Sequence, residues 1–180
     1  KAAIGRSISR SPDDWFAGAR PQGRVAIYDD DHYYLASVLA EALAAQGCEV
    51  EYICPQPAVA VWTDNTLEQG RIQARLLERG VRLHLSQSLV ASQAQGVLTR
   101  CVYTSHEQAV ACDALLLVSS RLPNDELLGE LDPARFATLR TVGDAQAPGI
   151  IAAAVWDGHR AARELGGGTG EVRRERVVMA

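Results

Sequence analysis

The sequence predicts an α/β protein whose parallel sheet carries helices on both faces, with an antiparallel β-meander inserted into the chain. Short apolar runs and amphipathic helical patterns alternate along residues 24–80, which is the order of a β-α-β-α unit. A near-continuous apolar run at 113–119 is typical of a central parallel strand covered on both faces. Between these regions lie three short segments separated by turn residues, and they predict the meander.

The first β-α-β unit has clear boundaries. An apolar strand is predicted at 24–28 and an amphipathic helix at 33–46. Gly47 follows that helix at the position where a left-handed backbone favours glycine. The second strand, 49–53, alternates polar and apolar residues, and the two prolines of 54–57 end it.

A second helix leads into the meander. Asp64, Asn65 or Thr66 can cap its start, and Gly80 ends it. Its expected apolar face consists of Leu67, Ile72, Leu76 and Leu77. A short strand is predicted at 81–85, and the meander strands are predicted at 88–91, 96–103 and 109–111, with a turn at Gln95-Gly96.

The two ends of the chain carry weaker patterns. Residues 1–23 hold several prolines and glycines and predict an irregular segment. Residues 120–139 predict one short helix within loops. A helix is predicted from Pro148-Gly149 to Gly166, and the small apolar residues at its start indicate close packing. The tail at 166–180 is expected to be mobile.

Composition excludes several classes of function. A net charge of −4 with 22% charged residues gives no general basic surface for nucleic acid. No apolar run is long enough to span a bilayer, and the first residues do not read as a leader. The four cysteines form no CxxC pair and no metal-binding spacing, so we expect buried, reduced thiols and a cytoplasmic protein. The chain begins at Lys1 without a methionine, which indicates a fragment or a processed product.

The turn after the first strand lacks the residues of a dinucleotide site. Such a turn needs glycines, because the backbone must approach a pyrophosphate at a helix N-terminus. Here it reads Asp29-Asp30-Asp31-His32-Tyr33-Tyr34. The carboxylates would repel a pyrophosphate, and the tyrosines would occupy its space. We therefore expect the carboxylates to cap the helix and the site to bind no dinucleotide.

Three stretches together resemble one family: IYDDDHYYLASVLAEAL at 27–43, VWTDNTLEQGRIQARLLERGV at 61–81 and VGDAQAPGIIAAAVWDGHRAA at 142–162. They are similar to the C-terminal nucleotide-binding region of the trimethylamine, dimethylamine and histamine dehydrogenases. That group belongs to a wider set of flavin and 4Fe-4S oxidoreductases of the NADH:flavin oxidoreductase type, which includes the dienoyl-CoA reductases. The resemblance covers about residues 20–165. It implies a Rossmann-like, disulfide-reductase-like nucleotide domain.

The resemblance also implies a domain organisation. Residues 24–140 correspond to an inserted domain of the NAD(P)H-binding type, degenerate at its turn. Residues 141–165 return to an outer domain of the ADP- or FAD-binding type, and 166–180 form the tail. A TIM barrel with FMN and the cysteines of a 4Fe-4S centre would precede Lys1.

The same resemblance supplies the candidate cofactor-binding residues, which are Gly143, Asp144, Gly149 and Ile150. In related flavoproteins the aspartate accepts a hydrogen bond from ribityl or ribose hydroxyls, and the following helix directs its N-terminus at the cofactor. The ligand would be ADP or FAD, and the alternative is a capping role alone for Asp144. We expect no catalytic residue and no metal ligand in this chain. Arg121 is a further candidate for a phosphate or a partner carboxylate, whereas His32, His84, His106 and His159 are expected to be structural.

Three functions follow as alternatives. The first is an accessory part of an amine-oxidising enzyme, inactive alone, which contacts its own barrel and passes electrons to an electron-transfer flavoprotein, in a homodimer. The second is part of an NAD(P)H-dependent flavin reductase or demethylase. The third is a free-standing module that binds a nucleotide or a protein.

Overall fold

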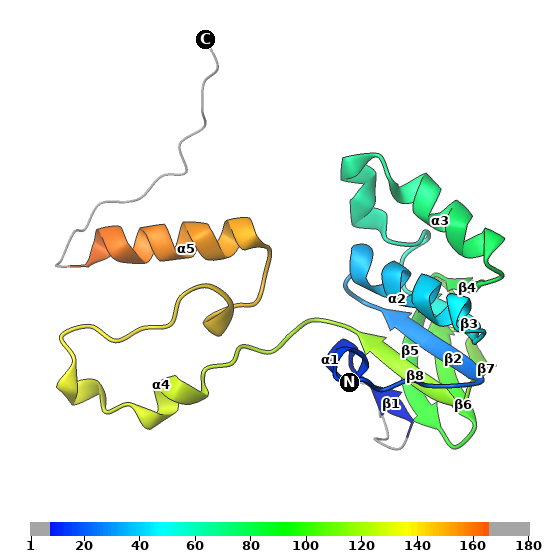
Figure 1. The fold of residues 1–180 in the computed structure, drawn as a ribbon, viewed down its shortest axis with the longest axis horizontal. Coiled ribbons are helices and arrows are strands. Elements are labelled where there is room, and N and C mark those ends of the chain that lie inside the picture. Colours follow the sequence, from blue (N-terminus) through cyan, green and yellow to red (C-terminus); the bar gives the residue numbers. More distant parts are fainter. Residues whose placement is uncertain (1–7, 166–180) are drawn as a thin grey trace, which may run out of the picture. The chain divides into compact units, whose positions relative to one another are not determined.

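The computed structural model describes residues 8–165, which form two compact units divided between Ser119 and Ser120 (Figure 1). The tail that was predicted to be mobile lies outside the described residues. None of the helices in residues 8–165 has the length and apolar character needed to cross a membrane.

The N-terminal unit is built on a five-stranded parallel sheet with the strand order β1-β8-β2-β3-β4. Its strands are β1 (Ser9–Arg10), β2 (Arg24–Asp29), β3 (Glu49–Cys54), β4 (Arg82–Leu85) and β8 (Ala114–Val118). Helix α2 (Tyr34–Ala45) joins β2 to β3, and α3 (Gln69–Glu78) precedes β4. The predicted parallel α/β sheet is confirmed, since each apolar run lies within a strand.

A second, three-stranded sheet confirms the predicted meander. It consists of β5 (Gln87–Gln93), β6 (Gly96–Cys101) and β7 (Glu107–Ala111), all antiparallel to their neighbours. The chain then enters β8, which pairs with β2 in the middle of the parallel sheet.

The prediction of helices on both faces of the parallel sheet is wrong. Successive residues of β2 point to opposite faces, so Val25 and Ile27 pack with α2 and α3 in one core cluster. Ala26 lies in a separate cluster with residues of the meander, including Val97 and Val110. The meander therefore covers the face on which a second layer of helices was expected.

The N-terminal segment is also more regular than predicted. Residues 9–10 form the edge strand β1, and α1 (Pro12–Phe16) follows it. Ser11 and Asp14 form a reciprocal capping box, and Pro12 stands at the first helical position, where it needs no hydrogen-bond partner. Trp15 packs into the core with only 7% of its surface exposed, and Arg20 lies 4.6 Å from its ring. Proline here begins an element instead of breaking one.

The second helix begins later than predicted. A 3-10 helix, η1 (Val61–Thr66), comes first, and Leu67 then adopts a left-handed backbone with φ of 61° and points to solvent. The α-helix starts at Gln69, so Asp64, Asn65 and Thr66 do not cap it. Ile72 and Leu76 are buried as expected, whereas Leu77 is exposed. The change of helix type shifts the angular positions on which the predicted apolar face depended.

Glu51 is a buried carboxylate on the β3–β4 edge of the sheet. Arg82 donates to it from Nε at 2.9 Å, and a ring nitrogen of His84 lies 2.8 Å from its Oε2. Burial alone would raise the pKa of Glu51, but the contacts with Arg82 and His84 outweigh burial and hold the pKa below its ordinary value of 4.5. The ionised form is therefore the form that the fold stabilises.

Replacing Glu51 with glutamine is expected to lower the free energy of unfolding by about 1–2 kcal/mol at pH 7, because half-exposed Arg82 weakens the pair relative to a fully buried one. Since the folded pKa of Glu51 is lowered, its contribution is present above about pH 4.5 and is lost as the pH falls through the folded value. Urea unfolding of both proteins from pH 7 to pH 3 tests this. A difference that stays constant over this range would contradict it.

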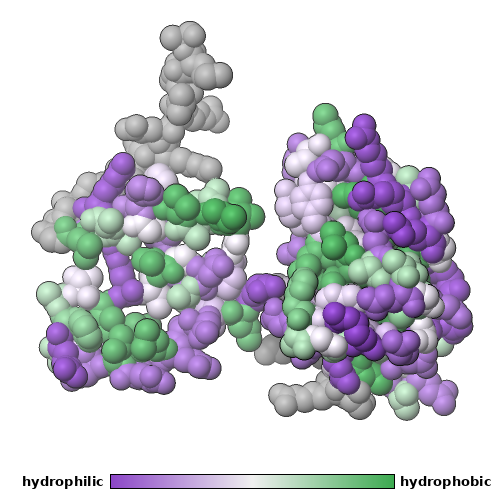
Figure 2. Space-filling model, viewed as in Figure 1, coloured by the Kyte–Doolittle hydropathy of each residue, from purple (hydrophilic) through white to green (hydrophobic). Residues whose placement is uncertain are grey.

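The C-terminal unit contains α4 (Glu126–Glu130), two 3-10 turns, η2 (Pro133–Arg135) and η3 (Gly143–Ala145), and α5 (Ile151–Glu164). Arg140 joins its loop to α5 by an ion pair of 2.7 Å with Glu164. The close packing expected at the start of α5 is not found within the described residues, because no residue of α5 is buried. Figure 2 shows hydrophobic residues on the surface of this unit. Its exposed large hydrophobic residues include Leu122, Leu127, Ile150, Ile151 and Val155.

Candidate functional site

The turn between β2 and α2 is organised around one buried carboxylate. Asp29, the last residue of β2, is completely buried. Its Oδ1 accepts the backbone N–H of Asp31 at 3.2 Å and that of His32 at 2.8 Å. Its Oδ2 accepts a short hydrogen bond from the hydroxyl of Tyr52, which is buried on β3. Two backbone amide groups of this turn are therefore satisfied from within the chain.

The protonation of this pair follows from its burial. Desolvation raises the pKa of Asp29, and the hydrogen bonds from Tyr52 and from the turn oppose that effect. Desolvation together with the negative charge of Asp29 raises the pKa of Tyr52 as well. Tyr52 therefore keeps its proton and acts as the donor.

The carboxylates do not cap α2 as predicted. Tyr33 occupies the position before the helix and makes no side-chain capping bond, and Asp30 and Asp31 are exposed. The hydroxyl of Tyr34 instead reaches the segment before α3, where it lies 2.9 Å from Thr66 Oγ1 and also bonds Glu68. Asp29 closes the turn itself, and this is a different means of satisfying free N–H groups.

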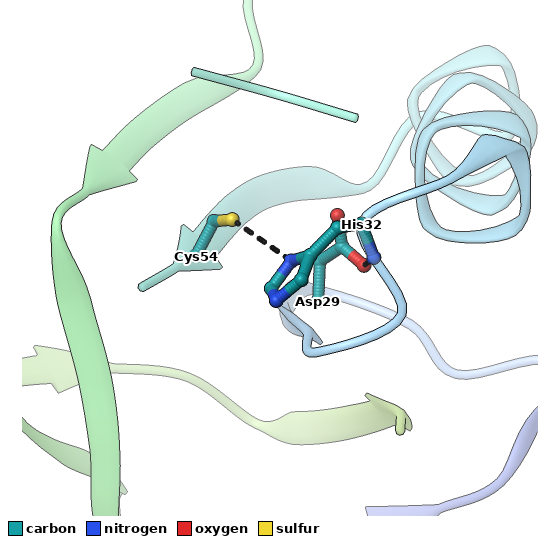
Figure 3. Close-up of side chains that lie close together, drawn as sticks. All are labelled: Asp29, His32 and Cys54. Atoms are coloured by element: carbon teal, nitrogen blue, oxygen red, sulfur yellow. Dashed lines mark hydrogen bonds between the residues drawn. The ribbon is translucent and has the colours of Figure 1, made fainter. Parts of the chain in front are cut away.

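Two further side chains lie beside Asp29 (Figure 3). His32 has a left-handed backbone with φ of 61°, and its Nδ1 lies 3.7 Å from the sulfur of Cys54, the last residue of β3. Donor atoms of Asp29, His32 and Cys54 all lie within 4.8 Å of one another. Burial raises the pKa of the Cys54 thiol to about 12, so the thiol carries its proton near neutral pH.

Sequence reasoning treated His32 and Cys54 separately and missed this cluster. A signal was present, because Asp29 and Cys54 each directly follow a predicted strand and the two strands are consecutive. The carboxyl ends of neighbouring parallel strands meet at one edge of a sheet, where α/β proteins gather ligands. Pairing of Tyr28 with Ile53 sets the register that brings the two residues to this edge.

The residues carried over from the resemblance lie together in one loop of the C-terminal unit. Asp144 Oδ1 accepts the N–H of Gly149 at 3.3 Å, which closes the loop between η3 and α5. Gly143 has φ of 60° and donates its N–H to Asp157 on α5 at 2.8 Å. That bond lowers the pKa of Asp157. Ile150 immediately precedes α5 and is exposed, so the helix opens at Ile151, later than the predicted start at Pro148-Gly149.

The remaining candidates take other places. In the described residues no strand leads directly into Gly143, although Val142 is extended. His84 contacts Glu51, a structural role of the kind predicted for it. All four cysteines are free thiols, with Cys54 and Cys112 buried and Cys48 and Cys101 half-buried.

Comparison with known proteins places the chain in a family. The family model of the OYE-like second alpha/beta domain matches residues 10–106. Dimethylamine dehydrogenase from Hyphomicrobium sp. (strain x) is 31% identical over 182 residues, which cover 86% of this chain and 24% of that protein.

Two solved structures of amine-oxidising enzymes are also similar to this chain. Histamine dehydrogenase from Rhizobium sp. 4-9 has a TM-score of 0.83 and 39% identity, and the match covers 97% of this chain and 28% of that one. The 6-hydroxypseudooxynicotine amine oxidase from Pseudomonas geniculata N1 has a TM-score of 0.79 and 31% identity, and covers 88% of this chain and 24% of that one. The chain thus spans about a quarter of the length of these relatives. It belongs to the family of OYE-like second alpha/beta domains, and the amine dehydrogenase group that it resembles is confirmed as its group.

Proposed function

We propose that this chain is the nucleotide-domain part of a larger flavin and iron–sulfur oxidoreductase that oxidises amines, and that it has a structural role without catalytic activity of its own. The observation that carries this proposal is the bonding of Asp29 to the N–H groups of Asp31 and His32. In a Rossmann-like domain, the corresponding turn offers its free N–H groups to a pyrophosphate. Here a buried carboxylate occupies two N–H groups of the turn, those of Asp31 and His32, and its charge also repels the ligand.

Electrostatics strengthens the argument against a nicotinamide cofactor. A pyrophosphate at this edge of the sheet would approach Asp29 inside the turn and the exposed Asp30 and Asp31 outside it. A few kcal/mol of repulsion removes useful affinity, since about 1.4 kcal/mol already raises the Kd tenfold. Electrons from the amine would therefore pass to a protein acceptor, an electron-transfer flavoprotein, and not to a nicotinamide nucleotide.

The rest of the proposal follows from family membership. Residues 24–140 would be the inserted, disulfide-reductase-like domain, and 141–165 would return to an outer domain that holds ADP or FAD through Gly143, Asp144, Gly149 and Ile150. Asp144 accepts the N–H of Gly149 at the end of the loop that leads into α5. The parent protein would carry FMN and a 4Fe-4S centre in its upstream part and would act in the cytoplasm, as a homodimer.

The test uses the native parent protein under anaerobic conditions. A methylated or primary amine is expected to bleach its flavin absorbance, whereas NADH and NADPH at millimolar concentration leave it unchanged. Calorimetry on the 180-residue chain should give a Kd above about 1 mM for either nicotinamide nucleotide. A Kd of 1 mM corresponds to a binding free energy of about −4 kcal/mol. Flavin reduction by NADPH would overturn the proposal in favour of a reductase or demethylase. A native product of only this chain's size would favour a free-standing binding module.

A further inference from the structure

Three ligand atoms of different chemistry meet where β2 and β3 end. The thiol of Cys54 and the carboxylate of Asp29 are buried, and the His32 side chain beside them is 14% exposed (Figure 3). Sulfur, imidazole nitrogen and carboxylate oxygen are the three donors that zinc accepts in proteins. Magnesium and calcium take oxygen donors, so this set does not suit them.

The distances approach those of a tetrahedral centre. With a Zn–S bond of about 2.3 Å and a Zn–N bond of about 2.0 Å, two ligands on a tetrahedral ion are separated by about 3.5 Å. The observed distance from Cys54 Sγ to His32 Nδ1 is 3.7 Å. The donor atoms of Asp29, His32 and Cys54 all lie within 4.8 Å of one another, so a side-chain adjustment of about 1 Å brings the carboxylate to bonding distance.

Surrounding groups orient these donors as the outer shell of a metal site does. The second ring nitrogen of His32, Nε2, lies 3.8 Å from Asp30 Oδ1, too long for a hydrogen bond. A small rotation of either side chain would form the carboxylate–histidine contact that orients the ring when the other nitrogen binds a metal. The N–H of Gln56 points to Cys54 Sγ at 3.4 Å and would stabilise a thiolate.

Asp29 has a free lone pair that could bind a cation, and its buried negative charge would be stabilised by one. An ionised carboxylate offers about four lone-pair positions, and its three bonds to Asp31, His32 and Tyr52 leave one, on Oδ2. The donors in these three bonds are neutral groups. Buried charges are ordinarily paired with an opposite charge or bound to a metal, and a divalent ion would supply the positive charge.

From this arrangement we propose that Asp29, His32 and Cys54 form a zinc-binding site, with a water molecule as the fourth ligand on the solvent side of His32. Binding replaces the Cys54 S–H bond with a sulfur–zinc bond, and the released proton passes to solvent. The ion fixes the end of β2 to the end of β3. The site is independent of the proposed amine oxidation and departs from the sequence-based expectation of no metal ligand.

The test measures metal binding by the full 180-residue chain after chelator treatment. Cobalt(II), as the spectroscopic probe for zinc, is expected to give the visible bands of a tetrahedral centre and a thiolate-to-cobalt charge-transfer band, at one ion per chain, and zinc should displace it. Zinc should also raise the Tm. His32→Asn removes a ligand while asparagine tolerates the left-handed backbone, and it should abolish both responses.

Two variants separate this site from other thiols and from misfolding. Cys101→Ser should bind cobalt as the unmodified chain does, because Cys101 lies on β6 and is not among the three donors. Asp30→Asn should fold normally and bind zinc about 10–100-fold more weakly, as loss of an outer-shell partner does. No tetrahedral cobalt spectrum, or an unchanged spectrum in folded His32→Asn, would overturn the proposal.

Discussion

Replacing Asp29 with alanine is expected to lower the free energy of unfolding by about 3 kcal/mol, measured by urea unfolding in a chelating buffer that removes any metal contribution. The substitution leaves the N–H groups of Asp31 and His32 and the hydroxyl of Tyr52 without their acceptor. A buried polar group without a partner costs about 1–3 kcal/mol, and the turn can relax enough to hydrate part of the set. Far-UV circular dichroism reports the transition.

Asp31→Ala is the matched control. Asp31 lies two residues away, is exposed, and contributes its backbone N–H rather than its side chain to the turn. Alanine keeps that N–H, so the expected change is within about 0.5 kcal/mol, as for most surface substitutions. Equal losses in the two variants would show that the turn needs negative charge in general and not the carboxylate of Asp29.

Gly96→Ala is expected to cost about 2–4 kcal/mol, because a side chain at this position collides with main-chain atoms. Gly96 begins β6 and has φ of 151°. A Cβ there would lie 2.3 Å from the carbonyl oxygen of Val110 and 2.9 Å from Ala111 Cα. The pairing of β6 with β7 would have to open to relieve the contact, and a lower urea midpoint would report the loss.

The control is Gly70→Ala in α3, where a Cβ meets no atom within 4 Å. Alanine reduces the backbone entropy of the unfolded chain and favours the helix, so this variant should gain about 0.5–1 kcal/mol. If Gly70→Ala and Gly96→Ala shift the urea midpoint in the same direction, the collision with β7 does not determine the result.

The elements that could be predicted from sequence are those in which local pattern and tertiary burial agree. The apolar run at 24–28 and the run at 113–119 were predicted as strands, and they lie side by side as β2 and β8. The predictions failed where tertiary context decided the outcome. Leu67 suits a helix face, yet a 3-10 turn places it in solvent. The layer that covers the second face of the sheet could not be predicted from local sequence either. An apolar residue such as Ala26 shows only that this face is buried, and not whether helices or the meander cover it.

The candidate site divides in the same way. The sequence shows that the turn after the first strand contains no glycine. This absence predicted a turn whose N–H groups are occupied by its own carboxylates. Which carboxylate fills it, and how, depended on Tyr52, which lies 23 residues further along and donates to Asp29. The proximity of His32 to Cys54 depends on the strand register and on the left-handed backbone of His32, and neither is encoded in residue spacing.

The pairing of β2 with β8 has a consequence for synthesis of the protein. Arg24 at the start of β2 is tied to Asp113, 89 residues later, by a hydrogen bond of 2.8 Å. At ribosomal rates of about 5–20 residues per second, β2 waits roughly 5–20 s for its partner, with the backbone groups of one edge unpaired. During that interval α2 and β3 can fold locally, whereas completion of the sheet requires closure over a long loop. A nascent chain stalled before β8 therefore exposes a strand edge that another chain can pair with.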